Sequence, residues 1–398
     1  MLSKKDNDDV FYELDNKTSN NMLSMMLETS AGSGEYQKTS ASTWPTEGYV
    51  FNESLSKCEK GSSLSWDSTE KIVVMTGNLS DKCYVYFDKT STLTEYVKAQ
   101  YTGTQGENNL YYHNSSLTNG AGDGSYRYAG SSETTNNFVC FGYDSQDGTC
   151  PSDNLYRIIG VFGDEVKLIK YDYTKSTLLG TDGDYCNSYK DCKGSSRDGT
   201  SNGQNSKTEI GVYYWNNNTN NNTWSESRLN TINLNKNYIN NIGTKWSKKI
   251  SDHTWKVGGN TESNIRLQTA TTAYQNEINS PAINKTVNAK VGLMYVSDYG
   301  YAASSSSWST VLSSYNNANV TANNWMYMGL NEWTLAPETD YSYIAFFVFY
   351  NGLVNSGGVY NVGGNNITAV GVRPALYLKS TIAYVSGSGT ISSPILIS

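Results

Sequence analysis

The six cysteines of this 398-residue chain constrain its fold most, because they fall in three close sequential pairs. The pairs are Cys58 and Cys83, Cys140 and Cys150, and Cys186 and Cys192. None has the Cys-x-x-Cys spacing of a zinc or redox site, and pairing between neighbours is the simplest of the connectivities that six cysteines allow. An even cysteine count is typical of oxidising compartments, where disulfides persist. We therefore predict three disulfides and an extracellular or cell-surface protein.

The composition points to a neutral surface of hydrogen-bonding groups. Charged residues make up 17 % of the chain, below the roughly 25 % of ordinary soluble domains, and there are 32 tyrosines. The formal net charge of −7 disfavours nucleic acid and anionic membranes as partners. The expected partner is a macromolecular ligand, protein or glycan. Because residues 1–9 lack an apolar signal segment, we expect membrane attachment only through an N-terminal anchor that was removed.

The chain offers little material for common catalytic or metal sites. Only two histidines, His113 and His253, are present, so a multi-histidine metal site or a Ser-His-Asp triad is not expected. We predict no catalytic residue, no metal and no cofactor. Calcium stays as an alternative because aspartates gather in two loops: Asp144, Asp147 and Asp153, and Asp182, Asp184 and Asp191.

Two other classes of function remain open. A glycosidase needs two carboxylates that can lie far apart in sequence, so a carbohydrate-active enzyme with paired loop carboxylates is one alternative. A structural subunit of a pilus or surface layer is another. The leading prediction is a non-catalytic adhesin or receptor-binding protein.

Local patterns divide the chain into four parts. Residues 1–43 include a helical pattern and predict an N-terminal helix or stalk remnant, and residues 44–95 predict a small β module clamped by Cys58 and Cys83. Residues 96–137 are rich in Gly, Ser and Asn, which predicts a linker. Residues 138–398 form the predicted ligand-binding domain.

Within that last part the patterns predict an α+β fold with much irregular loop. Residues 154–172 read as two strands joined at Gly163-Asp164, a direct hairpin signal. Helices are expected between about 225 and 250, a buried strand over 291–302, and further strands from Glu332 onward.

The stretch 339–370 combines aromatic residues with asparagines and has no charge after Asp340. Rigid aromatic area together with adaptable amides is typical of binding loops. Because side chains alternate along a strand, Phe346 and Val348 are expected in the core, with Phe347 and Phe349 pointing outward. The predicted ligand-binding residues are Tyr341, Tyr343, Ile344, Phe347, Phe349, Asn351, Asn355, Tyr360 and Asn361. Val354 and Leu376 are also predicted to be scaffold.

Three segments carry a resemblance to a known family. YRIIGVFGDEVKLIK, NEWTLAP and the ending GVRPALYLKSTIAYVSGSGTISSPILI resemble bacterial surface proteins with C-type-lectin-like domains, over roughly residues 125–398. In that family a hairpin, a Trp-Ser-Leu helix (here Trp224, Ser227 and Leu229) and a Glu-Trp pair (here Glu332-Trp333) precede a variable stretch. The chain then returns to the core at Gly371 to Pro374. The resemblance implies a C-type-lectin-like domain preceded by the small disulfide-clamped β module.

Similar domains include the formylglycine-generating enzyme fold and the variable proteins of diversity-generating retroelements. The enzyme's chemistry needs paired cysteines near its C terminus, whereas the last cysteine here is Cys192. The variable proteins are altered at adenines, and randomising the adenines of an AAC codon cannot produce Glu, Lys, Gln, Met or Trp. These types number 65 in the chain, so about five are expected in a 32-residue window, but residues 339–370 contain none. This favours a retroelement-diversified surface.

Overall fold

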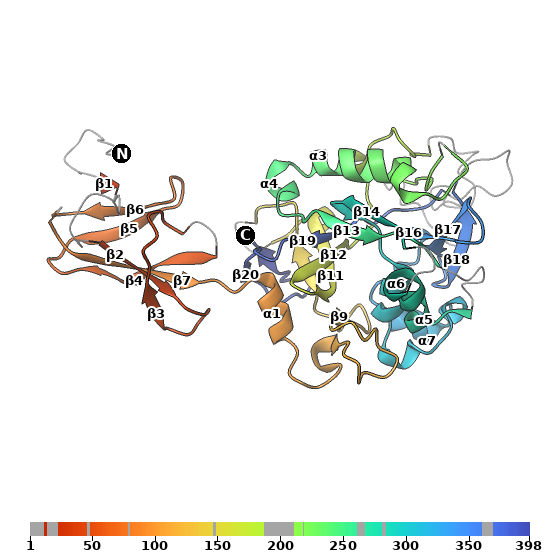
Figure 1. Cartoon of the computed structure of the whole chain (residues 1–398), viewed down its shortest axis with the longest axis horizontal. Helices are drawn as coiled ribbons and strands as arrows, with labels where there is room; N and C mark the ends of the chain where they lie inside the picture. The colour runs from red at the N-terminus through yellow and green to blue at the C-terminus, as the bar shows by residue number, and fades with distance from the viewer. Residues whose placement is uncertain are drawn as a thin grey trace. The chain divides into compact units, whose positions relative to one another are not determined.

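The computed structural model describes residues 12–13, 23–45, 48–78, 80–145, 149–186, 211–217, 219–260, 267–280, 284–359 and 369–398. They form two compact units. The first comprises the chain up to Glu95 together with 381–385 and Ser398, and the second comprises 96–380 and 386–397. Each unit contains its own sheets. In Figure 1 the colour follows the chain, so the strands β1 to β7 of the first unit are red to orange, and the second unit runs from orange to blue.

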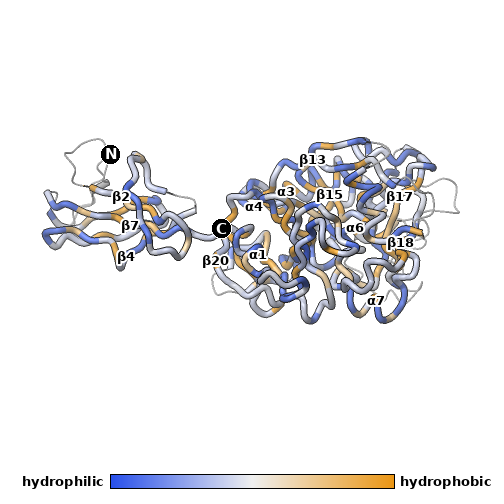
Figure 2. The backbone as a smooth tube through the Cα atoms, turned by 60° about the horizontal axis from the view of Figure 1, so that its bottom comes forward, coloured by the Kyte–Doolittle hydropathy of each residue, from blue (hydrophilic) through white to orange (hydrophobic). Residues whose placement is uncertain are grey.

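The first unit contains two sheets. One has the order β3 (Tyr36–Lys38), β2 (Leu23–Glu28), β7 (Cys83–Lys89) and β4 (Tyr49–Cys58), and the other has β1 (Tyr12–Glu13), β6 (Ile72–Thr76) and β5 (Ser63–Asp67). β7 shows why these residues form strands: Cys83, Val85 and Phe87 alternate into the core. Hydrophobic stretches lie inside this unit, and its outer turns are hydrophilic (Figure 2).

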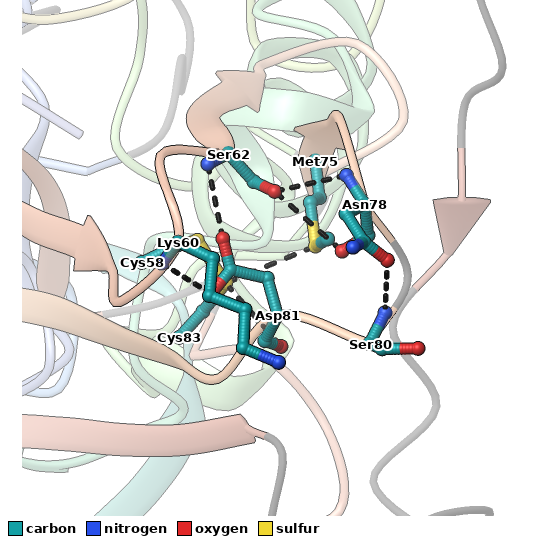
Figure 3. Close-up of a disulfide and its surroundings, with 8 residues drawn as sticks. All are labelled: Cys58, Lys60, Ser62, Met75, Asn78, Ser80, Asp81 and Cys83. Carbon is teal, nitrogen blue, oxygen red and sulfur yellow. Dashed lines mark hydrogen bonds between the residues drawn. A yellow bond between two sulfur atoms is a disulfide. The ribbon is translucent and has the colours of Figure 1, made fainter.

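A disulfide between Cys58 and Cys83 links β4 to β7, as the sequence predicts. The core around it includes Met75, which contacts the Cys83 sulfur. Beside it, Asp81 accepts hydrogen bonds from the Lys60 and Ser62 backbone N–H groups (Figure 3). Burial opposes ionisation of Asp81, but these hydrogen bonds outweigh it and lower the pKa of its carboxyl. In the chain-entropy model this cross-link stabilises the unit by about 3 kcal/mol.

The prediction of a helix or stalk over residues 1–43 is wrong for the described residues. Leu23–Glu28 is the strand β2, which pairs with β7 in parallel and with β3 in antiparallel fashion. The short apolar run is compatible with the repeat of a helix and with that of a strand. Pairing with β7 favours the strand because it buries Met25 in the core of the unit. The helical pattern consists of Leu14, Met22, Met25 and Met26, and of these Leu14 and Met22 lie outside the described residues.

The second unit is built on a seven-stranded antiparallel sheet. The order is β15 (Val291–Gly292), β19 (Ala375–Leu378), β12 (Glu165–Lys170), β11 (Leu155–Phe162), β9 (Tyr126–Tyr128) and β8 (Leu110–Tyr112), with β10 (Phe138–Cys140) also paired to β11. The hairpin predicted at Gly163-Asp164 is confirmed, because β11 and β12 pair on either side of it. Gly163 has φ +63°, the left-handed region that glycine adopts without strain.

The prediction that residues 96–137 are a linker is wrong. β8 and β9 lie in this range, and β9 pairs with the central strand β11, so the second unit begins at Tyr96 instead of residue 138. Their tyrosines stack, with the Tyr112 and Tyr126 ring centroids 4.6 Å apart. Short strands between Gly-rich turns thus carry a linker-like composition while pairing with the core sheet.

Helices of one to three turns and smaller sheets surround the central sheet. Two short sheets are formed by β13 (His253–Lys256) with β14 (Thr286–Ala289), and by β16 (Glu332–Pro337), β17 (Ile344–Val348) and β18 (Val354–Gly358). The chain closes with β20 (Tyr384–Ser386) and β21 (Leu396–Ile397). The helices are α1 (Leu93–Ala99), η1 (Glu107–Asn109), η2 (Ser152–Asn154), α2 (Ser176–Leu179), η3 (Trp224–Glu226), η4 (Leu229–Tyr238), α3 (Ile239–Asn241), α4 (Thr244–Ser247), α5 (Ala270–Tyr274), η6 (Gln275–Asn279), α6 (Val296–Ala302), η7 (Ser305–Ser307), η8 (Leu312–Ser314) and α7 (Ala318–Ala322).

These elements match the sequence patterns in part. Helices fall within 225–250 as predicted, whereas the strand expected over 291–302 is only β15 followed by the helix α6. Within the described residues no helix combines the length and the hydrophobicity that crossing a membrane requires.

A second disulfide joins Cys140 to Cys150, again as predicted. Cys186 is also disulfide-bonded. Cys192, its predicted partner, lies outside the described residues.

The two segments NEWTLAP and GVRPALYLK meet at a buried ion pair. Arg373 donates from Nε and Nη2 to the two carboxylate oxygens of Glu332, over 2.5 and 2.6 Å, and both side chains are 1 % exposed. Arg373 Nη2 also donates to the Met326 carbonyl over 2.7 Å. The pair ties the start of β16 to the segment that leads into β19, and so fixes the β16–β17–β18 sheet on the central sheet.

Candidate functional site

The predicted ligand-binding residues lie on the β16–β17–β18 sheet and its turns. The turn between β16 and β17 contains Tyr341 and Tyr343, which are 47 % and 42 % exposed. Their ring centroids are 5.8 Å apart in an edge-to-face arrangement. Most other aromatic side chains of this unit are buried, so this pair offers unusual apolar area to solvent.

A single asparagine holds this turn in place. Asn222, from the loop before η3, approaches the carbonyl oxygens of Glu338, Tyr341 and Ile344 with its side-chain Nδ2, at 2.7, 3.0 and 2.7 Å. Its backbone N–H donates to the Ser342 carbonyl over 2.6 Å. A turn fixed in this way loses little conformational entropy on binding, which favours its use as a recognition element.

Phe347 does not point outward as predicted. It is 5 % exposed and packs on Trp333, with ring centroids 5.8 Å apart. Trp333, its partner in the strand register, donates its Nε1 to the Tyr213 carbonyl, so the segment around Tyr213 covers this face of the sheet. Phe346, on the opposite face, is fully buried. Both faces of β17 are therefore covered, and alternation along the strand does not separate core from surface here.

The remaining predicted residues fall into two groups. Ile344, Phe349, Asn351 and Asn355 are half-buried, and Tyr360 and Asn361 lie outside the described residues. The predicted scaffold residues Phe346, Val348, Val354 and Leu376 are buried. Of the predicted ligand-binding residues that the structure describes, it thus brings only Tyr341 and Tyr343 together as exposed aromatic area.

A pocket of about 330 Å³ lies beside the tyrosine turn. It is lined by residues 221–225, 257–258, 285–287 and 337–339, with Ser342 from the turn itself. Its volume is at the lower end of the range that small-molecule sites occupy. Asn222, which holds the turn, therefore also forms part of the pocket wall.

Glu338 is the buried carboxylate of this pocket. It is 3 % exposed, and no described residue donates a hydrogen bond to its Oε2. Burial, with a smaller contribution from the charge of Asp340, raises the pKa of Glu338 to about 7. The buried Nε1 of Trp224, another lining residue, also finds no acceptor in the described part of the chain. Sequence reasoning missed both groups; the only signal was the polar tract around Trp224, whose spatial neighbours the sequence does not reveal.

The aspartates of the calcium alternative have other partners. Asp144 pairs with Lys245 Nζ over 2.6 Å, and Asp153 pairs with Lys175 Nζ over 2.8 Å. Asp184 accepts two backbone N–H groups, and burial raises its pKa to about 6. Asp147 and Asp191 lie outside the described residues. Across the described part of the chain, no three His, Cys, Asp or Glu side chains are grouped closely enough to hold a metal ion.

The two histidines lie apart from the pocket. His113 is fully buried, where Nδ1 accepts from the Ala121 N–H and burial lowers the pKa of the ring. His253 Nδ1 lies 3.0 Å from Glu165 Oε2, and its ring stacks on Tyr377. Neither belongs to the lining of the candidate site.

No protein-family model matches the chain significantly, and neither a curated protein nor a solved structure does so. The tyrosine turn and its pocket are therefore interpreted from their own chemistry.

Proposed function

We propose that the chain is an exported ligand-binding protein, an adhesin or receptor-binding protein, that contacts a macromolecule through the turn between β16 and β17. The observation that carries this proposal is the exposed pair Tyr341 and Tyr343 beside a 330 Å³ pocket. Tyrosines supply large contact area at low entropic cost, and aromatic anchors next to a pocket are typical of binding hot spots.

The disulfides are consistent with the extracellular location in this proposal. A C-type-lectin-like arrangement of the second unit is also part of the proposal. It is supported by the segment resemblance and by the buried contact of Glu332 with Arg373, which joins two of the resembling segments.

Diversification by a retroelement is proposed for residues 339–370. The absence of Glu, Lys, Gln, Met and Trp from this stretch supports it, and the two exposed tyrosines lie within the stretch. A reverse-transcriptase gene and a near-copy of this coding stretch should lie next to the gene. Genomic sequencing that finds neither would remove diversification from the proposal.

One observation favours an enzyme as the second candidate. Glu338 lies in a pocket with its pKa raised to about 7, as a general acid requires, and Asp340 is a second carboxylate nearby in sequence. Sugar release from polysaccharides that stops on Glu338→Gln substitution would favour this glycosidase alternative over simple binding.

Replacing both Tyr341 and Tyr343 by Ser should abolish most ligand binding while leaving the fold intact. Central aromatic anchors cost about 2 kcal/mol or more each when truncated, so the double variant loses about 4 kcal/mol and should bind several hundredfold more weakly. The assay is flow cytometry of the labelled protein on a panel of bacterial and animal cells. The control is Tyr143→Ser, because Tyr143 is also 42 % exposed but outside the site. Equal binding by both variants would remove the tyrosine turn from the proposal.

A further inference from the structure

Among the described buried carboxylates of the second unit, Glu338 differs because no donor reaches its Oε2. Glu332 pairs with Arg373, and Asp298 pairs with Lys167 Nζ over 2.5 Å. For Glu338 the described residues supply neither an ion pair nor a hydrogen bond to Oε2, although it is 3 % exposed. Leaving a buried acceptor unpaired lowers the stability of the fold, because the acceptor has lost its hydrogen bonds to water and gained none in return. A ligand that brings a donor would remove that cost.

The shape of the pocket suits a donor on an aliphatic stem. Val257, Val287 and Pro337 supply apolar wall, and Glu338, whose carboxylate Oε2 is buried, also belongs to the lining. The last side-chain torsion of a glutamate is only weakly restricted, and a half-turn exchanges its two carboxylate oxygens. Rotation about this bond can therefore present either oxygen to the pocket. A long side chain can thus lay its methylene groups against the wall and place its charged head on the carboxylate.

We propose that this pocket binds the ammonium group of a lysine side chain on a protein ligand, with Glu338 as its counter-ion. The inference rests on the proposed binding function and specifies the chemistry of the ligand. Ser342, which lies between the exposed Tyr341 and Tyr343, is part of the pocket lining, so in this proposal the two tyrosines contact the chain that carries the lysine. A cation near their ring faces is also favoured by the ring quadrupole.

The charge balance around the pocket determines its pH dependence. Besides Glu338, the surrounding charged groups include Asp340 on the turn and Lys285 in the lining. Two further carboxylates lie next to them: Glu226, which accepts a hydrogen bond from Asn221 Nδ2, and Glu277, which accepts one from Asn260 Nδ2. Lys285 is exposed, so solvent screens its repulsion of a bound cation. Ammonium binding requires the ionised carboxylate, which is present above pH 7 and lost as the pH falls below 7.

The test uses the whole protein and Nα-acetyl-lysine amide, with Nα-acetyl-norleucine amide as the matched probe that lacks the ammonium. Calorimetry or NMR titration should show saturable binding of the lysine probe at least tenfold tighter than the norleucine probe. Affinity at pH 6 should be about tenfold weaker than at pH 8, because the ionised fraction of a group with pKa about 7 changes by that factor. Equal binding of the two probes, or no loss at pH 6, overturns the proposal.

Variants and a sugar probe complete the test. Glu338→Gln should weaken lysine-probe binding at least tenfold, whereas Glu226→Gln, which removes the same charge from an exposed neighbour, should not. Methyl β-glucosaminide carries an ammonium on a sugar, and tighter binding of this probe overturns the assignment to lysine.

Cell binding that persists without lysine-probe binding contradicts only this inference. Lysine-probe binding without any cell binding contradicts only the proposed function.

Discussion

Replacing Arg373 by Met should lower the free energy of unfolding of the second unit by about 3–5 kcal/mol. The substitution leaves the Glu332 carboxylate, which is 1 % exposed, without the two hydrogen bonds that Arg373 donates. The Met326 carbonyl also loses its 2.7 Å bond from Arg373 Nη2. A buried charge without its partner is costly because water cannot replace the lost donors. Urea denaturation followed by tryptophan fluorescence measures the effect.

The double variant Glu332→Met, Arg373→Met separates the cost of an unpaired charge from the value of the pair. Replacing both members of a buried ion pair by apolar residues of similar size is often close to neutral, so the double variant should be more stable than either single variant. A double variant as unstable as Arg373→Met would show that lost packing, and not the unpaired carboxylate, dominates. A cost below about 1 kcal/mol for Arg373→Met would contradict the buried geometry.

Short-range signals in the sequence predicted local structure well. Gly163-Asp164 marks the β11–β12 hairpin because a two-residue turn leaves few alternative pairings for the flanking strands. The predicted pairing of Cys58 with Cys83 is confirmed, because cysteines close in sequence meet easily on neighbouring strands. These signals depend only on residues near one another in the chain.

The sequence gives misleading signals where the structure of a segment depends on residues far away in the chain. Met25 lies in a strand because β7, about sixty residues later, provides the pairing edge. Phe347 is buried because Trp333 and the segment around Tyr213 cover its face of the sheet. Alternation reveals which residues share a face of a strand, but it does not reveal whether that face meets solvent.

The pocket could not be predicted because four separate segments form its wall. Asn222 and Glu338 are 116 positions apart, yet the Asn222 side chain donates to the Glu338 carbonyl. A lone glutamate in a loop gives no signal of burial in the sequence, since most glutamates are exposed and solvated. Tyr341 and Tyr343 stand out in the sequence because they open a stretch, 339–370, that combines aromatic residues with asparagines.

Replacing Phe346 or Phe347 by Ala should each cost about 3–5 kcal/mol of stability, whereas replacing Tyr341 by Ala should change stability by less than about 0.5 kcal/mol. Phe346 and Phe347 are 0 % and 5 % exposed on opposite faces of β17, so each truncation leaves a cavity that the covered sheet cannot fill. Tyr341 is 47 % exposed and packs edge-to-face on Tyr343. Thermal melts and urea denaturation of the three variants compare them directly.

The position of Phe347 decides how far the recognition surface extends. If Phe347→Ala is as stable as the parent protein, that side chain is free to contact ligand and the surface continues along β17. If it unfolds as readily as Phe346→Ala, recognition is confined to the turn and its pocket. Replacing Tyr341 and Tyr343 by other residue types then alters binding without disturbing the sheet. Asn222 holds the turn through backbone carbonyls, which every residue type provides. The turn can thus vary in sequence while its shape is kept.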